Sequence, residues 1–397
     1  MLIDSNATHI DLWQQQERIL DDLFQISNLP ITASSDAKDK LKSEFFDYLF
    51  EQSFDALHGG ILVSDMPSPS KTELFYKPIA LNSMVCECLV SAAVVFYEGE
   101  FMVVAEKIIS MLCDKLESED YYLLNELSFT RKQLESNFSK KNSRNLLDGK
   151  EIELLNALTT GDSINNLQSV VIAYHRSLEN AANMIDMHYK QARIVEHRLC
   201  EKLKFKLVIH KCDEHSTPLP NPLDINCDLV IALANFSLCS PQSNKLVIAE
   251  KVYEKILGMA NKQEFQHLDL CKLIHAGIIL LQCDFRIERF QAILDMTSKF
   301  TNLYAKKKQQ MNDSTKINYQ IAFINSFVAK SREVFNSRIL AEFNFVLPQG
   351  EKQFRFTFIN SESVDLDHKL TGLRSKFDPN HFIFVVDPSY MSTLALK

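Results

Sequence analysis

Apolar residues return every three to four positions from residue 8 to about residue 345, which is the period of amphipathic helices. Loops rich in glycine, proline, serine and asparagine interrupt this period. The segment 164–202 is longer than an average globular helix, so we expect a break between Glu179 and Met187 or a protruding hairpin. The pattern predicts helices near residues 9–27, 37–57, 79–97, 101–117, 130–139, 149–158, 164–202, 225–238, 243–260, 267–282, 286–308 and 315–337.

The C-terminal part follows a different pattern. Polar and apolar residues alternate from Phe354 to Ile359, residues 364–377 have a helical period, and an apolar run covers His381 to Val386. A strand, a helix and a strand in this order predict a βαβ unit with two parallel strands, which must be covered by the helical body or joined by other strands. The alternation from Leu203 to Ile209 predicts one further short edge strand.

Part of the helical pattern is repeated. Residues 78–107 align without a gap with residues 222–251, at a constant offset of 144. Pro78 aligns with Pro222, Asn82 with Asn226, Leu89 with Leu233, Val103 with Val247, and Ala105-Glu106-Lys107 with Ala249-Glu250-Lys251. Repeated helical units bury a shared core that one unit cannot bury alone.

We therefore expect a mainly α protein, either an α/α toroid or a helical-hairpin array, with a small C-terminal βαβ element. The expected division is residues 1–55 as N-terminal helices, 56–345 as the toroid-like body and 346–397 as the C-terminal α/β element. A chain of 397 residues with 46% hydrophobic residues is long enough to bury a sizeable core.

The composition limits the kinds of partner, cellular location and cofactor that we expect. A net charge of −8 and only short basic runs argue against nucleic acid. No stretch of eighteen apolar residues and no signal-peptide pattern is found, so we expect no membrane partner and a cytoplasmic location. Nine scattered cysteines without a C-x-x-C spacing fit reduced, buried thiols. With nine glycines and no Gly-rich phosphate loop, we expect no nucleotide cofactor, and no other cofactor is implied.

Three motifs resemble the YyaL-like proteins and the animal spermatogenesis-associated proteins, which join a thioredoxin-like domain to an α/α toroid of the six-hairpin glycosidase type. Their G-G-x-x-x-x-S-x-D loop is similar to Gly59-Gly60 with Ser64-Asp65, followed by Pro78. Their second motif, with D-D-K before W-N-G-L, is similar to residues 220–229, and their D-Y-A-x-L-I-x-G-L-L pattern is similar to residues 269–280.

The resemblance spans about residues 55 to 390 and implies that inner-helix ends face a central cavity, where sugar-processing relatives place two carboxylates. The family's His, Glu and Lys after Pro78 are replaced here by residues 79–83, Ile-Ala-Leu-Asn-Ser, and one Asp, the Lys and the Trp of the second motif are missing. No thioredoxin-like segment is found. The chain therefore resembles a degenerate member of the family.

The resemblance nominates two groups of site residues. The candidate catalytic carboxylates are Asp65, Asp224 and Asp269, and the candidate ligand-binding residues are Tyr76, Asn82, Glu87, Asn226 and Asp228. The alternative for Asn82, Asn226 and Asp269 is that each caps a helix, a role that contributes about 1 kcal/mol.

A metal site is a weaker hypothesis. His210, Cys212 and His215 offer ligand types that zinc prefers, although their spacing fits no familiar finger, and the alternative is an ordinary strand and polar loop.

Because the polar family positions are lost, we expect a non-catalytic binding or scaffold protein, with an unknown protein partner or a carbohydrate-like small molecule. The alternative is a carbohydrate-active enzyme, such as an epimerase, isomerase or glycoside hydrolase, that uses carboxylates in a toroid cavity. A third possibility is a helical solenoid adaptor with an exposed groove.

Overall fold

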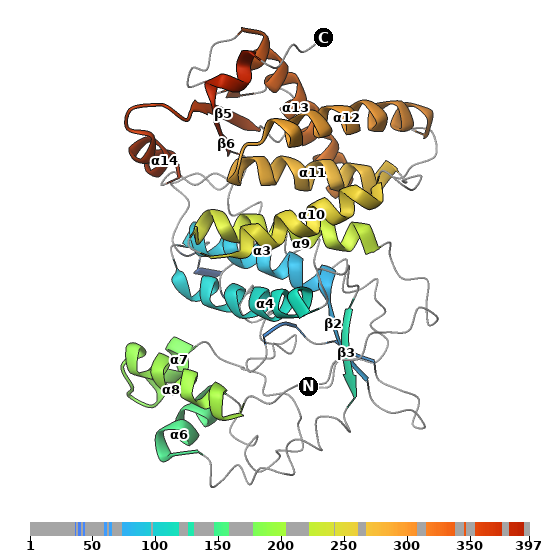
Figure 1. The fold of residues 1–397 in the computed structure, drawn as a ribbon. Coiled ribbons are helices and arrows are strands. Elements are labelled where there is room, and N and C mark those ends of the chain that lie inside the picture. The colour runs from blue at the N-terminus through green and yellow to red at the C-terminus, as the bar shows by residue number, and fades with distance from the viewer. Residues whose placement is uncertain are drawn as a thin grey trace.

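The computed structural model describes most of the helical chain (Figure 1). It covers residues 36, 39, 40, 43, 59–61, 63–65, 74–96, 98–118, 126–130, 147–158, 178–203, 222–241, 243–260, 267–307, 315–337, 345–346, 354–374 and 381–392.

Within these residues the protein is mainly α, as the sequence predicts, with two small sheets. The helices are α3 (Ile79–Phe96), α4 (Gly99–Ser118), α6 (Gly149–Leu158), α7 (Leu178–Met184), α8 (Tyr189–Leu203), α9 (Pro222–Cys239), α10 (Lys245–Ala260), α11 (His267–Cys283), α12 (Ile287–Lys307), α13 (Thr315–Ser337), α14 (Leu366–Arg374) and the 3-10 helix η4 (Pro388–Ser392). The strands are β1 (Val63–Asp65), β2 (Leu74–Pro78), β3 (Glu126–Thr130), β4 (Phe345–Val346), β5 (Arg355–Asn360) and β6 (His381–Val386).

The body is a stack of helical hairpins (Figure 1). Helices α3 and α4, α9 and α10, and α11 and α12 pair as hairpins, and the first helices pack on one another in the order α3, α9, α11. Both copies of the repeated sequence therefore form a hairpin, and their first helices lie side by side. A hairpin array is what the described helices show, while its closure into a toroid stays a prediction.

The inner row consists of the most apolar helices. In α3, α9 and α11 most described side chains are buried and the others are half-buried, except the exposed Cys239 at the end of α9, so these helices lack the solvent-facing side of an amphipathic helix. By length and composition α3 would also be able to cross a membrane, but 67% of it is buried inside the fold, as in the core helix of a globular protein. One or two such helices are weak evidence for a membrane span.

The helix predicted at residues 164–202 is interrupted within its described part, residues 178–202, as expected. Helix α7 ends at Met184, a turn follows with Asp186 at φ 51°, and α8 begins at Tyr189. Helices α6, α7 and α8 pack together as a small unit. At its start, Asp148 and Glu151 cap α6 reciprocally, because the N–H of each donates to the carboxylate of the other at 2.8 and 2.9 Å.

A second sheet near the N-terminal side was not predicted. β2 pairs antiparallel with both β1 and β3, and β2 leads directly into α3. Residues 126–130 form β3, so the helix expected at 130–139 is wrong at its first residue, and its other residues lie outside the described part. The strands are short, and β1 lies in a segment with turn residues on both sides, which hid it from the periodicity.

The C-terminal βαβ unit is confirmed. β5 and β6 pair in parallel with α14 between them, and β4 joins antiparallel on the other side of β5. The sheet packs on α11 and α13 through phenylalanine rings: Phe323 lies 4.6 Å from Phe382, and Phe327 lies 5.2 Å from Phe384, between ring centroids. Helix α14 begins at Leu366, two residues after the start of the helical period at residue 364.

Two polar contacts join α4 to the α7–α8 pair. Glu100 accepts a hydrogen bond from the backbone N–H of Leu178, the first residue of α7, at 3.0 Å, and Lys107 forms an ion pair with Glu196 of α8. Burial raises the pKa of Glu100, the Leu178 N–H opposes this, and the nearby Glu179 raises the pKa further. The ionised form of Glu100 is thus disfavoured in the folded protein.

We expect Glu100→Gln to stabilise the protein at pH 7, because Gln keeps an acceptor for Leu178 without the buried charge. A carboxyl whose pKa is higher when folded supports folding below its unfolded pKa and loses that support as pH rises through the folded pKa. The gain should therefore shrink to nothing between about pH 7 and pH 4. Urea unfolding across this range measures it, and a gain that grows toward acid would contradict the assignment.

The absence of a side chain at Gly277 lets α10 and α12 pack closely against α11. A Cβ atom at Gly277 would collide with the Tyr253 hydroxyl and lie 3.1 Å from Ile293. Burial raises the pKa of Tyr253, and in the described part of the chain its hydroxyl has no hydrogen-bond partner. The tyrosine oxygen thus occupies the space that a side chain on α11 would need.

Gly277→Ala should lower the free energy of unfolding by about 1 to 2 kcal/mol, since the clash outweighs the better helix propensity of alanine. Most of this loss should disappear in a Tyr253→Phe background, which a double-mutant cycle by urea unfolding measures. Gly258→Ala is the matched control: Gly258 is exposed on α10 with open space around it, so alanine there should stabilise by about 0.5 to 1 kcal/mol. An equal loss in both backgrounds would contradict the steric explanation.

Candidate functional site

Polar side chains are buried or largely buried in the first half of each inner helix, up to the middle of α11. Asn82 lies in α3, Asn226 and Asp228 lie in α9, and Lys272 and His275 lie in α11. Because α10 runs back between α9 and α11, these two helices have the same direction, and their N-terminal ends lie at the same end of the stack.

Asn82 holds the loop before the first sheet. Its Oδ1 accepts from the backbone N–H of Ile61 at 2.7 Å, and its Nδ2 donates to the carbonyls of Ile61 at 3.3 Å and Pro78 at 2.8 Å. Asn82 is fully buried. All these partners are backbone groups that would otherwise lose water without compensation, so the side chain acts as an internal brace.

The braced loop is compact because it contains two glycines. Gly59 and Gly60 have φ values of 74° and 91°, which side chains rarely adopt. A Cβ at Gly59 would meet the backbone of Lys107 in α4, and one at Gly60 would lie 2.7 Å from the Met111 side chain. Lys77, buried to 1% exposure, donates from Nζ to the Gly59 carbonyl at 2.5 Å. Loop, β2, α3 and α4 are therefore locked together at this point.

Asp228 and Lys272 join the next two inner helices. Lys272 Nζ donates to Asp228 Oδ2 at 3.3 Å, and both side chains are largely buried. Asn226, two residues earlier in α9, is fully buried. The carboxylate of Asp228 is thus engaged in an ion pair with the neighbouring inner helix.

His275 continues the polar set toward α13. Its Nδ1 lies 3.3 Å from Nε2 of Gln320 in α13, and both side chains are buried. The imidazole also lies edge-on to Phe323, with ring centroids 5.0 Å apart. The ring is thus enclosed by an amide and an aromatic side chain.

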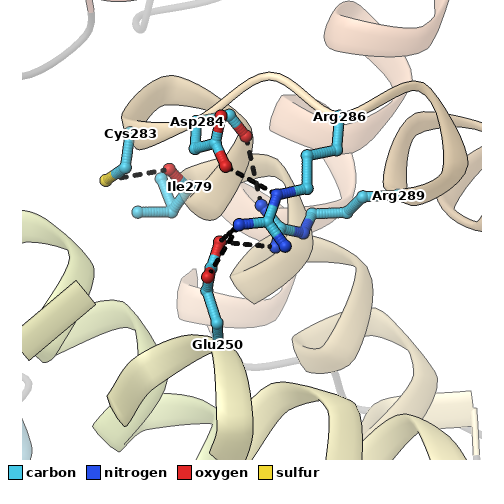
Figure 2. A network of polar contacts seen from close by, with 6 residues as sticks. All are labelled: Glu250, Ile279, Cys283, Asp284, Arg286 and Arg289. Atoms are coloured by element: carbon cyan, nitrogen blue, oxygen red, sulfur yellow. Dashed lines mark hydrogen bonds and ion pairs between the residues drawn. The ribbon is translucent and has the colours of Figure 1, made fainter. Parts of the chain in front are cut away.

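A second polar network ties α10 to the turn between α11 and α12 (Figure 2). Glu250 of α10 accepts from Nη2 of Arg286 at 2.8 and 2.9 Å and from Nη2 of Arg289 at 3.0 Å. Asp284 binds the Arg286 Nε at 2.6 Å, and its carbonyl accepts from Arg289 at 3.1 Å. The hydrogen bond to Asp284 raises the pKa of Arg286, and Glu250 adds to this. Cys283 donates to the carbonyls of Ala234 and Ile279 beside the network.

The candidate catalytic carboxylates lie on elements that lead into or begin the inner row. Asp65 is the last residue of β1, and Asp224 and Asp269 are the third residues of α9 and α11. The backbone thus brings Asp224 and Asp269 to the same end of two packed helices, while their side chains, and those of Asp65 and Tyr76, lie outside the described part.

The capping alternative is wrong for Asn82 and Asn226. α3 begins at Ile79 and α9 at Pro222, so both asparagines lie inside their helices rather than before them. Asp269 lies in the first turn of α11. Glu87 is half-buried on α3. The weak metal candidates His210, Cys212 and His215 lie outside the described residues, and no cluster of three metal-ligating side chains occurs within them.

Sequence reasoning missed Lys77, Lys272, His275 and Gln320. Each is a polar residue inside an apolar run, and in Leu270-Cys-Lys-Leu-Ile-His275 the two polar residues are three apart. Residues three apart share a helix face, so this spacing is the signal that marks a polar strip on a buried helix. The polar contacts of the described inner helices are thus the ion pair of Asp228 with Lys272, the hydrogen bonds of Asn82 and the contact of His275 with Gln320.

Replacing Asn82 tests the brace. Asn82→Ala should lower the free energy of unfolding by roughly 2 to 4 kcal/mol, because it leaves buried backbone groups of residues 61 and 78 without partners. The matched control is Asn302→Ala on the exposed side of α12, where the change should stay within about 0.5 kcal/mol. Urea unfolding measures both, and comparable small effects would contradict the bracing role.

Comparisons with protein-family models, with curated proteins and with solved structures find no match to this chain.

Proposed function

We propose that this chain is a non-catalytic binding or scaffold protein, built on the helical-hairpin frame of a degenerate YyaL-like toroid, with a protein as its partner. The observation that carries the proposal is that the described polar residues of the inner helices α3, α9 and α11 are bonded to other parts of the chain. Asn82 is bonded to the loop and to Pro78, Asp228 to Lys272, and His275 lies against Gln320.

These hydrogen bonds and this ion pair hold segments of the fold together, which is a structural role. A general acid or base must exchange protons with a substrate, so it needs a face open to that substrate and a pKa suited to the task. The described residues Asn82 and Asp228 are buried, and both are bonded to other parts of the chain. Replacing Asn82 or Asp228 should therefore lower the stability of the fold rather than remove a contact with a ligand.

A carbohydrate-active enzyme remains the second candidate function. One observation favours it: Asp224 and Asp269 occupy equivalent first-turn positions on the packed helices α9 and α11, where two carboxylates of a glycosidase would be held. Asp65 on β1 would be the third carboxylate. This function requires that the carboxylates meet in a cavity open to a sugar.

A thermal-shift panel of monosaccharides, oligosaccharides and sugar phosphates at millimolar concentration separates the two functions. A ligand at a hundred times its Kd adds about 2.7 kcal/mol, which a melting curve detects. For a scaffold protein we expect a flat panel. A dose-dependent rise in Tm that disappears in Asp224→Asn and Asp269→Asn, without loss of Tm in the absence of sugar, would overturn the proposal in favour of the enzyme.

A further inference from the structure

Helix α8 packs against the protein with one face and exposes the opposite face to solvent. Ala192, Val195 and Leu199 are buried against the protein, and Glu196 forms the ion pair with Lys107 of α4. At the far end, Lys202 donates to Glu151 of α6 at 2.7 Å. The inner side of α8 is thus fixed by packing and by two ion pairs, so its outer side is held in a defined geometry.

An aliphatic side chain stands at the centre of the outer face. Ile194 is 62% exposed, and Met184 at the end of the adjoining α7 is 61% exposed. Only two other large hydrophobic residues, Val247 and Val364, are exposed in the described part of the chain. Burial of such a side chain by a partner removes apolar surface from water, which stabilises a complex.

Basic side chains surround Ile194. Lys190, Arg193 and His197 lie four residues before, one before and three after it, and all three are exposed. Within the described ranges their side chains form no ion pair or hydrogen bond. The other cations of α8 are used internally: Lys202 binds Glu151, and Arg198 lies 4.0 Å from Asp148. Glu201, one turn beyond His197, is the exposed acidic residue of this face.

The spacing indicates which partner fits. Residues 190, 194 and 197 are four and three positions apart and therefore share one face of the helix, which can pack along a second helix. Lysine and arginine around an apolar anchor on a chain of net charge −8 favour a partner that carries acidic residues around its own apolar stripe. One exposed aliphatic residue offers far less apolar area than a membrane-binding helix needs.

We propose that the face formed by Lys190, Arg193, Ile194 and His197 docks an acidic amphipathic helix of a protein partner. This names the kind of partner for the scaffold function proposed above and rests on that function. The aliphatic anchor contributes burial, and the cations around it select for acidic residues and fix the register.

The test uses the full chain and a fluorescein-labelled synthetic peptide of about 20 residues, long enough to form a helix. Leucine recurs in it with helical period, and glutamate fills the flanking positions. Fluorescence anisotropy should show saturable binding that weakens at least about tenfold in Lys190→Glu/Arg193→Glu and in Ile194→Ser. Binding should also weaken with salt, because surface charges are screened.

Matched variants elsewhere on the surface serve as controls. Lys299→Glu/Arg332→Glu changes two exposed cations on α12 and α13, and Val247→Ser removes an exposed aliphatic residue of α10. These should bind the peptide as the unmodified chain does. Equal weakening by the controls, no binding of the peptide at millimolar concentration, or binding to phosphatidylglycerol vesicles in place of the peptide would overturn the docking proposal.

The outcome is separable from that of the sugar panel. If the peptide fails to bind while the sugar panel is flat, the docking face is wrong and the scaffold function stands. If sugars raise Tm through Asp224 and Asp269, the scaffold function is wrong whatever the peptide does.

Discussion

Helices α3, α9 and α11 are apolar on nearly every side, so each must be enclosed by other parts of the chain, and this requirement organises the body. Each is covered by the second helix of its own hairpin and by the neighbouring inner helices. At one end of the row the C-terminal sheet closes the core with phenylalanine rings from β5 and β6 against α13. The outer helices can be amphipathic because the inner row has already satisfied the need for burial.

A polar residue in the enclosed inner row destabilises the fold unless it forms hydrogen bonds or ion pairs within the protein, because a buried polar group loses its hydrogen bonds to water. The fold meets this demand by joining elements far apart in sequence: Asn82 to residue 61, Asp228 to Lys272, and His275 to Gln320. Such bonds specify which helix lies beside which, since apolar packing alone tolerates sliding. The same residues are thereby withdrawn from contact with a ligand.

Strong periodicity explains what could be predicted from the sequence. Helices α6, α13 and strand β6 begin and end at the expected residues, because their apolar positions recur without interruption. The sequence pattern does not predict strands β1, β2 and β3, because strands of three to five residues contain too few alternations of polar and apolar residues to be distinguished from the surrounding helical pattern. Asn82 and Asn226 precede apolar runs and so have the sequence pattern of helix caps, but the helices begin earlier than those runs do. Lys77 and Gln320 could not be identified as buried from sequence, because burial depends on distant segments.

The tripeptide Ala-Glu-Lys occurs in both aligned segments, at residues 105–107 and 249–251, but its side chains have different partners in the two hairpins. In α4 its lysine, Lys107, pairs with Glu196, and Glu106 is exposed. In α10 its glutamate, Glu250, receives two arginines, and Lys251 is exposed. Identical residues therefore contribute unequally to the fold: a substitution should be tolerated at Glu106 and should destabilise the protein at Glu250. An exchange of one hairpin for the other would keep the apolar packing and lose these ion pairs, so the two hairpins are not interchangeable.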